Sequence, residues 1–492
     1  MGQTGAGDGA GKHRVLIDNG EYWLRNRGDI AMMVMTVERL RERWPHARIG
    51  MLTDQPHILN GLLPQAEPVV AYAGGQWGRG SGWGAGGVPG RLDRAAAVHL
   101  TGPAAVQWRA LTEVPKHHLR EARDRVRDGV RALTGEPRPE RDDGMPDLPP
   151  VPAALADSAL VIAQGGGYMT DIDKYQAHRT LNLLEAAQQH GIPNVMIGQG
   201  LGPMNDPELL RRAATVLPGV DLIAVREGLR GPELLEQVGV HSDRILVTGD
   251  DAVEFAYRLR RPEIGTDLGL CLRISDYSKV SDSARDTLGE VVRREGRALG
   301  TALAPLIISE YDDEDRRHTL PLLGGAHRTR PVIARTGTAQ DVARQVSRCR
   351  VLVTSAYHLA VFALSQGIPA VAVTASQYYD DKFYGLADMF EASTADASTA
   401  DAGTAQASTA ESEAAGAGLR IVHLDSEHLE TELTRAIRQL WEAAPDLRDT
   451  LQRKAVEQID AGRAGLERVY GLVDGDGGNR PVADSAVSLQ GE

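Results

Sequence analysis

The segment from Arg350 to Leu386 limits the possible folds of this chain most strongly, because it has the pattern of one complete parallel α/β unit. The β-branched run Val351–Val353 predicts a short strand that is buried on both faces. A helix is predicted from about Tyr357, and a Gly-x-Pro stop ends it. A second buried strand and a loop that ends in Lys382 follow. Strands and helices in this order predict a parallel sheet with crossover helices.

His358 is the most informative residue of that segment. It falls in the first turn of the predicted helix, just past the carboxyl end of a strand. A lone histidine is more often a partly buried side chain bonded to a carbonyl group. However, ligands of open α/β sheets bind at strand ends, and the free N–H groups of a helix start attract anions. The position therefore favours a functional histidine beside an anion site.

The same alternation of strands and helices extends over most of the 492 residues, which is enough for two domains. Strands are predicted at Arg14–Asp18, Ala159–Ala163, Asn194–Gly198, Leu222–Val225, Arg244–Thr248, Leu268–Ile274, Leu303–Ile308, Pro331–Ala334, Arg350–Thr354, Ala370–Thr374 and Arg420–Leu424. Helices are predicted at Asp29–Trp44, Tyr175–His190, Asp206–Leu217, Gly231–Val238, Ser281–Leu299, Ala339–Ser347, Glu427–Glu442 and Leu447–Val469. We expect two open, parallel, Rossmann-like domains that face one another across a cleft, as in GT-B glycosyltransferases.

A charged, proline-containing stretch at Tyr257–Ile264 predicts the domain boundary. The expected parts are an acceptor-side domain at 13–258 and a donor-side domain at 259–473, with loops at 73–90 and 135–152 and disordered segments at 1–12, 392–418 and 474–492. The 73–90 loop contains Trp77 and Trp83. This loop is equally compatible with a lid over a sugar and with a packed surface loop.

Composition excludes several classes of function. A net charge of -13 and a pI near 5.6 argue against nucleic acid and anionic membrane surfaces as main partners. The two cysteines form neither a metal-binding pattern nor a disulfide framework. No signal peptide and no run long enough to span a membrane is evident. We therefore expect a cytoplasmic protein with no metal and no nucleic-acid partner.

Three short motifs follow predicted strands in the first half of the chain. Asn26-Arg27-Gly28-Asp29 opens a helix, where the null alternative is only a helix cap. Gly165-Gly166-Gly167 and the segment Gly198–Pro203, which includes Gln199 and Gly200, are glycine loops that allow a ligand to approach the backbone. The second loop is not a dinucleotide fingerprint, because its third glycine is misplaced and a proline follows.

Together, and in this order, the motifs resemble the polysaccharide pyruvyl transferase family over about Arg14 to Leu386. The further matching residues are Ala224-Val225-Arg226-Glu227, Asp250 or Asp251, Arg273, Glu314-Asp315, Ser355-Ala356-Tyr357-His358, and Lys382 with Gly385. The resemblance implies an enzyme that transfers a pyruvyl group from phosphoenolpyruvate to sugar hydroxyls as a ketal. Phosphoenolpyruvate is then a co-substrate, and no cofactor is required.

The resemblance also implies roles for individual residues. His358 is expected to be the general acid. Donor binding is expected from Arg273, Ser355, Tyr357, Lys382, Glu314 and Asp315. The acceptor, or the space beside it, is expected to contact Asn26, Gly28, Asp29, Gly165, Gly166, Gly167, Gln199, Gly200 and Arg226. The adjacent acids Asp250 and Asp251 more often cap the following helix than bind a metal.

One departure keeps two other functions open. The family has an arginine two residues before the histidine, and this chain has Ala356. Losing an anion-binding arginine favours a GT-B nucleotide-sugar glycosyltransferase slightly, and a non-catalytic carbohydrate-binding or partner protein is a third hypothesis. The order of the motifs favours pyruvyl transfer. Arg273, Arg226, Lys382 or the Tyr357 hydroxyl are the candidate replacements for the missing arginine.

Overall fold

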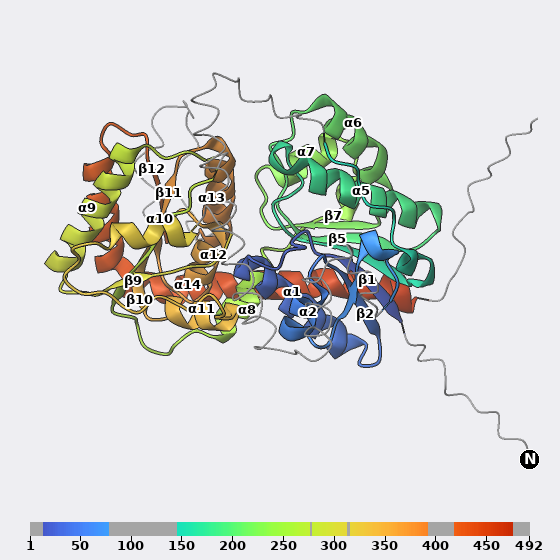
Figure 1. Cartoon of the computed structure of the whole chain (residues 1–492), viewed down its shortest axis with the longest axis horizontal. Helices are drawn as coiled ribbons and strands as arrows, with labels where there is room; N and C mark the ends of the chain where they lie inside the picture. The colour runs from blue at the N-terminus through green and yellow to red at the C-terminus, as the bar shows by residue number, and fades with distance from the viewer. Residues whose placement is uncertain (1–12, 78–144, 276–277, 312–314, 392–417, 476–492) are drawn as a thin grey trace, which may run out of the picture.

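The computed structural model describes residues 13–77, 145–275, 278–311, 315–391 and 418–475, which form two α/β domains (Figure 1). Within these residues the first sheet has the strand order β3-β2-β1-β4-β5-β6-β7, and the second has the order β12-β11-β10-β8-β9. Every pairing between neighbouring strands is parallel. The predicted fold class, two open parallel-sheet domains, is confirmed.

The first sheet consists of β1 (Arg14–Asp18), β2 (Arg48–Leu52), β3 (Glu67–Val69), β4 (Leu160–Gln164), β5 (Asn194–Gln199), β6 (Leu222–Val225) and β7 (Ile245–Val247). Its helices are α1 (Arg27–Arg43), α2 (Pro56–Leu62), α5 (Lys174–Gln189), α6 (Pro207–Val216), α7 (Gly231–Gln237) and α8 (Ala252–Arg258). The second sheet consists of β8 (Asp267–Cys271), β9 (Leu303–Pro305), β10 (Cys349–Thr354), β11 (Ala370–Thr374) and β12 (Leu419–His423). The helices around it are α9 (Asp282–Ala298), α10 (Asp315–Leu322), α11 (Ala339–Val346), α12 (Tyr357–Ser365), α13 (Gln377–Phe390) and α14 (Leu429–Asp474).

Burial on all sides explains why several strands and one helix have continuous apolar sequences. Every residue of β4 and β11 is buried, as expected for parallel strands covered on both faces. All residues of α12 are buried as well, so its sequence shows no helical periodicity. Phe362 of this helix packs on Phe255 of α8, with ring centroids 5.9 Å apart. Thus the helix that begins beside His358 lies in the core where the two domains meet.

The last helix, α14, contacts both domains (Figure 1). Arg438, in its first half, pairs with Glu295 of α9 at 2.7 Å. In its last turns, Tyr470 donates to the carbonyl of Arg39 at 3.1 Å, and Asp474 accepts from the indole of Trp44 at 2.9 Å. The prediction of two helices separated near Pro445 is therefore wrong. A proline removes one helical hydrogen bond, but the helix around it is held by packing on both domains.

Two further predictions of secondary structure differ from the structure, and several short elements were missed. The segment Pro331–Ala334 is not a strand, because its carbonyl groups accept hydrogen bonds from side chains, among them those of Arg27 and Arg316. The segment that carries Lys382 is the helix α13 and not a loop, since its aromatic residues pack on one side. The short strands β2 and β3 and the helices α2, α8 and α10 were not predicted.

Some sequence predictions fall wholly or mainly on residues outside those described. These are the predicted disordered segments, the loop at 73–90 beyond Trp77, most of the loop at 135–152, and Glu314. Trp77 itself packs on Gly50 and donates to the carbonyl of Ala154 at 3.1 Å, as the packed-loop reading expects. Within the described ranges, none of the helices combines the length and the apolar character that crossing a bilayer requires.

Candidate active site

The two sheets bring their topological switch points together. The strand order reverses between β1 and β4 in the first sheet and between β8 and β10 in the second. Ligands of open α/β sheets bind at the carboxyl ends of such strand pairs. The motif Asn26–Asp29 follows β1 and Gly165–Gly167 follows β4, whereas Arg273 follows β8 and Ser355–His358 follows β10. Contacts between these motifs place the candidate site at the interface of the two domains.

Three glycines make these contacts possible. A Cβ atom on Gly28 would lie 2.3 Å from the ring of His358. On Gly167 it would lie 2.3 Å from Nζ of Lys382, and on Gly200 it would lie 2.2 Å from Nη2 of Arg226. Any other residue at these positions would displace the functional side chain opposite. In two of the three pairs, a glycine of the first domain receives a side chain of the second.

His358 lies beside an aspartate and an arginine of the first domain. Its Nε2 atom is 3.6 Å from Oδ2 of Asp250, which accepts from Nη1 of Arg226 at 3.0 Å. Asp250 also accepts from the backbone N–H of Ala252, as the predicted helix-capping role requires. The Nε2 atom of His358 is buried and has no hydrogen-bond partner in the described parts of the chain. The sequence analysis missed Asp250 as a neighbour of the histidine.

Two bases of the site are driven toward their neutral forms. Burial lowers the pKa of His358 to about 3, which Asp250 opposes and Arg226 reinforces. Burial also lowers the pKa of Lys382 well below its usual value, and Arg226 adds to the shift. At neutral pH the imidazole is therefore uncharged while the site is empty of anions. An anion that binds here would reverse both shifts.

Lys382 joins α13 to the glycine loop of the first domain. Its Nζ atom is hydrogen-bonded to the hydroxyl of Tyr378 and lies 3.8 Å from the centroid of that ring. The Tyr378 hydroxyl in turn donates to the carbonyl of Gly167 at 3.1 Å. Tyr378 was not predicted as a site residue. Its spacing of one helical turn from Lys382 would have indicated it, had this segment been recognised as a helix.

Arg273 is anchored from behind by Asp315. The guanidinium donates from Nε to Oδ1 at 2.8 Å and from Nη2 to Oδ2 at 3.3 Å. Asp315 is fully buried and also accepts from the backbone N–H groups of Ile308 and Ser309. Ser355 accepts from the backbone N–H of Arg273 at 2.6 Å. Asp315 and Ser355 thus position Arg273, although both were predicted as donor-binding residues.

Arg226 and Tyr357 occupy the region next to Ala356. The Arg226 guanidinium lies 4.6 Å from the centroid of the Tyr357 ring and donates from Nη2 to the carbonyl of Gly166 at 2.9 Å. Burial works against its charge, but Tyr357 and Asp250 raise its pKa above the usual value. Ala356 is completely buried at the start of α12. The first domain thus supplies an arginine close to the position where the family's own arginine is absent.

Asp29 is the acid of the site that remains partly accessible. Burial raises its pKa to about 8, and Glu21 and Asp250 add to this effect while Arg226 and Arg273 oppose it. The neighbouring Asn26 caps α1 by accepting from the backbone N–H of Gly28 at 3.0 Å. Asp29 therefore faces the cations of the site, whereas Asn26 holds the glycine that contacts His358.

Arg27, the variable residue of the first motif, fastens the two domains together. Its buried guanidinium donates to the carbonyls of Gly337 at 2.7 Å and Arg335 at 2.9 Å, and it pairs with Glu310 at 3.2 Å. All of these partners belong to the second domain. This contact has no signal in the sequence, because an arginine at an exposed helix start and one buried at an interface have the same local pattern.

The remaining predicted residues shape the glycine loops. A Cβ atom on Gly165 would lie 2.0 Å from the carbonyl oxygen of Gly198, and one on Gly166 would lie 2.7 Å from Tyr168. Gln199 is fully buried and donates to the carbonyl of Ala163 and to the hydroxyl of Tyr168. Gln199 therefore supports the loop through these two hydrogen bonds.

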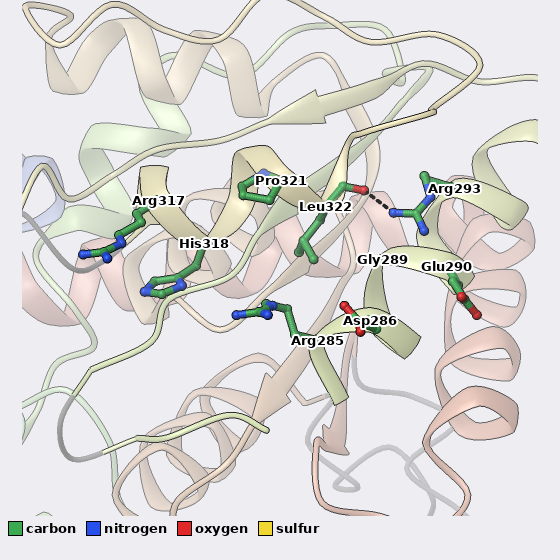
Figure 2. A pocket seen from close by; sticks show the side chains of 9 residues that line it. All are labelled: Arg285, Asp286, Gly289, Glu290, Arg293, Arg317, His318, Pro321 and Leu322. Atoms are coloured by element: carbon green, nitrogen blue, oxygen red, sulfur yellow. Dashed lines mark hydrogen bonds between the residues drawn. The ribbon is translucent and has the colours of Figure 1, made fainter. Parts of the chain in front are cut away.

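A separate cavity of about 430 Å³ lies between α9 and α10 (Figure 2). Its lining residues are Arg285, Asp286, Gly289, Glu290, Arg293, Arg317, His318, Pro321 and Leu322. None of them belongs to the group around His358. Among the described residues, no cluster of histidine, cysteine, aspartate or glutamate has the arrangement of a metal site.

Solved structures share the two-domain fold. A structure described as a UDP-N-acetylglucosamine 2-epimerase from Listeria monocytogenes is 12% identical, with a TM-score of 0.51 over 94% of this chain and 96% of the other. A glycosyltransferase from Rickettsia africae is 8% identical, with a TM-score of 0.47 over 95% of this chain and all of the other. At such low identity the likeness establishes a GT-B-like fold alone.

Comparison of the sequence with family models identifies the protein family, which the shared fold does not. No functionally curated protein matches the chain significantly. The family model described as polysaccharide pyruvyl transferase matches residues 26–377, from the motif that opens α1 to the first residue of α13. This range includes the three glycines, Arg226, Asp250, Arg273 and His358, and it covers well over half of the chain. The chain belongs to the polysaccharide pyruvyl transferase family.

Proposed function

We propose that this protein is a transferase that moves the pyruvyl group of phosphoenolpyruvate onto two hydroxyls of a sugar, forming a cyclic ketal. The observation that carries the proposal is the meeting of His358 with cations from both domains. Arg226 comes from the first domain, and Arg273 and Lys382 come from the second. All three lie close enough to influence the pKa of His358.

Phosphoenolpyruvate carries a carboxylate and a phosphate, and each needs a cationic partner. Arg273 is held by two hydrogen bonds to Asp315, which fix the orientation of its guanidinium group. Arg226 lies over Tyr357 beside Ala356, which supports it as the substitute for the family's arginine. Lys382 is the third cation, and its hydroxyl partner Tyr378 ties it to the glycine loop.

His358 is the proposed general acid. Protonation of the methylene carbon of the donor turns it into a methyl group and leaves an oxocarbenium-like centre, to which the first sugar hydroxyl adds. The phosphate then leaves, and the second hydroxyl closes the ketal. One of the two hydroxyl protons replaces the proton that His358 gave, and the other departs with phosphate. Asp250 favours the protonated imidazole, and the donor's negative charge favours it further.

Asp29 is the proposed base for the acceptor. Asp29 is partly accessible and directly follows Gly28, the glycine that contacts His358. Its pKa of about 8 suits proton transfer near neutral pH. The acceptor would therefore approach from the first domain. A cytoplasmic location remains the expectation from composition and is part of this proposal.

Ala356 favours the glycosyltransferase alternative, whose donor diphosphate would sit at the start of α12. Calorimetry at millimolar ligand separates the two, using phosphoenolpyruvate and a set of nucleotide sugars. We expect binding of phosphoenolpyruvate and release of phosphate when a sugar acceptor is added. Tight binding of a nucleotide sugar with no binding of phosphoenolpyruvate would replace our assignment by the alternative. Binding of neither class would favour a protein without catalytic activity.

A further inference from the structure

A second group of polar side chains lies on the same edge of the first sheet, toward β2 and β3. Arg179 of α5 is 7% exposed, yet its buried Nη2 atom has no hydrogen-bond partner in the described ranges. Its Nη2 atom lies 4.0 Å from Oδ1 of Asp54, which follows β2, and that oxygen also lacks a hydrogen bond there. A buried guanidinium with unused donors is costly, because each unused donor has lost water without gaining a partner.

Aromatic rings enclose this pair. The Arg179 guanidinium lies 3.6 Å from the centroid of the Tyr22 ring and 5.9 Å from that of Tyr72. Tyr72 is 59% exposed, and its hydroxyl lies 2.5 Å from that of Tyr175. The group thus has a buried polar floor and an exposed aromatic rim. Such a combination is typical of sites that bind sugars, where one ring face stacks and the hydroxyls bond below.

Local hydrogen bonds fix the floor in place. Tyr22 donates to Asp18 at 2.5 Å, and Thr180 donates to the same carboxylate at 2.7 Å. Thr180 directly follows Arg179 in α5, so Asp18 anchors the turn that carries the arginine. The arginine is therefore held in a defined position although its Nη2 atom has no hydrogen-bond partner there.

The position of the group relative to His358 follows from the sheet order. Gly28, which contacts His358, follows β1, while Asp54 and Tyr72 follow β2 and β3. The group therefore lies on the β2 side of the motif that contacts His358, at the same edge of the sheet. This side is where the next ring of a glycan would extend if its terminal sugar lies beside Asp29.

We propose that Arg179, Asp54, Tyr72 and Tyr175 form a subsite for a neutral sugar ring of an acceptor longer than one residue. The inference rests on the proposed function, because it names the acceptor of that same site. A hydroxyl group satisfies both unpaired partners at once, since it accepts from Arg179 and donates to Asp54. The floor contains one arginine and two carboxylates, Asp18 and Asp54, so an uncharged sugar fits better than a uronate or a sugar phosphate.

The test measures sugar binding directly and then the kinetics. Saturation-transfer NMR with lactose, cellobiose, maltose and mannobiose is compared with glucuronate and glucose 1-phosphate. The variants are Arg179→Gln, Asp54→Asn, Tyr72→Ala and Tyr72→Phe, and the control is Arg212→Gln. Arg212 of α6 pairs with Glu185 of α5, the helix that carries Arg179, but it has no part in the proposed subsite. Thermal unfolding of each variant verifies that it is folded.

We expect at least one neutral disaccharide to bind, and Arg179→Gln to weaken it by roughly tenfold or more. Tyr72→Ala should also weaken it, while Tyr72→Phe and Arg212→Gln should leave it nearly unchanged. Once the acceptor is identified, the subsite variants should raise its KM and leave the KM for phosphoenolpyruvate unaltered. Failure of every neutral disaccharide to bind, tighter binding of the anionic sugars, or equal binding by Arg179→Gln and Arg212→Gln would overturn the subsite.

The outcome also separates this inference from the proposed reaction. Disaccharide binding that depends on Arg179, without any pyruvyl transfer from phosphoenolpyruvate, supports the subsite and refutes the donor assignment. Pyruvyl transfer whose acceptor KM is the same in all variants supports the reaction and refutes the subsite.

Discussion

Asp250 and Asp251 are adjacent in the chain but belong to two very different charged groups. Asp251 pairs with Arg39 at 2.7 Å, and Arg39 makes two further hydrogen bonds to Glu254. Glu254 also pairs with Arg258 and Arg463, so this group joins α1, α8 and α14. Asp250 instead faces Arg226 and His358 at the domain interface. One residue step thus separates a group that holds the domains together from the candidate active site.

The two groups differ in how well their charges are compensated. Although burial raises it, hydrogen bonds from Arg463 and Arg39 hold the pKa of Glu254 at about 2. Around Asp250 the shifts go the other way, because His358 and Lys382 are driven toward neutrality and Asp29 toward its protonated form. Charged side chains that are paired within the protein stabilise the fold, whereas groups with perturbed pKa values and incomplete pairing are typical of ligand-binding sites. This difference leads to four predictions.

The largest effect is expected from Glu254→Gln. Glu254→Gln takes a charged partner from Arg39, Arg258 and Arg463 at once, so the free energy of unfolding should fall by about 3–5 kcal/mol. The folded pKa of Glu254 lies below the unfolded value of ~4.3, so its stabilisation is complete above that pH and is lost as the pH falls toward 2. Urea unfolding at pH 7 measures the change, and activity per folded molecule should be unaltered.

The control for that variant is Glu38→Gln, which removes an exposed partner of Arg258. Exposed ion pairs contribute about 0–1 kcal/mol. Equal losses for the two variants would show that the group around Arg39 does not hold the domains together.

His358→Ala should affect the other group alone. Loss of a general acid typically lowers turnover by a hundredfold or more, and we expect that loss in kcat for ketal formation. The matched control is His178→Ala, because His178 is also 7% exposed but lies on α5, outside the site. A similar loss of turnover in both variants would mean that His358 acts through packing rather than through proton transfer.

The variant Ala356→Arg tests whether the buried position 356 can accommodate the arginine that the family has there. Ala356 is completely buried beside Tyr357, so the longer side chain should overpack the interface and destabilise the fold by about 1–3 kcal/mol. Ala356→Ser provides the small-residue control. Tighter binding of phosphoenolpyruvate by Ala356→Arg, with unchanged thermal stability, would contradict our assignment of Arg226 as the substitute.

The smallest effect is a change in proton count. His358 has a pKa of about 3 in the empty site and is neutral at pH 7, while a bound anion raises the pKa of the ring. Binding of phosphoenolpyruvate at pH 7 should therefore take up about one proton at His358. Calorimetry in two buffers with different ionisation enthalpies measures the uptake, and His358→Ala should reduce it. Proton release on binding would be incompatible with a histidine that is charged by its ligand.

Much of the fold was predictable from sequence because buried strands such as β10 and β11 are short and rich in β-branched residues. The strand β2 was missed, since the run Arg48–Leu52 contains a glycine and has no β-branched residue besides Ile49. Pro331–Ala334 was apolar enough for a strand, but its carbonyls serve arginine side chains. The sequence pattern of one segment does not show which distant side chains will donate hydrogen bonds to its backbone carbonyls.

The site was predictable to the extent that each residue lies in a motif. His358, Arg226 and Lys382 come together as expected from the order of the motifs at strand ends. Asp250 looked like a helix cap, and it is one, but its other oxygen faces His358. Arg27, Arg179 and Asp54 have no local sequence motif. Their roles depend on contacts with residues that are distant in the chain.

The contact of α14 with both domains also has a consequence for synthesis on the ribosome. Trp44 is covered by Tyr470 and Asp474, which are translated last among the described residues. At ~5–20 residues per second, the roughly 200 residues that separate the end of the first domain from these partners take about 10–40 s to make. During that interval the nascent first domain exposes the surface around Trp44 that α14 later covers. A fragment that stops after α8 should therefore need chaperones to stay in solution, even with its sheet complete.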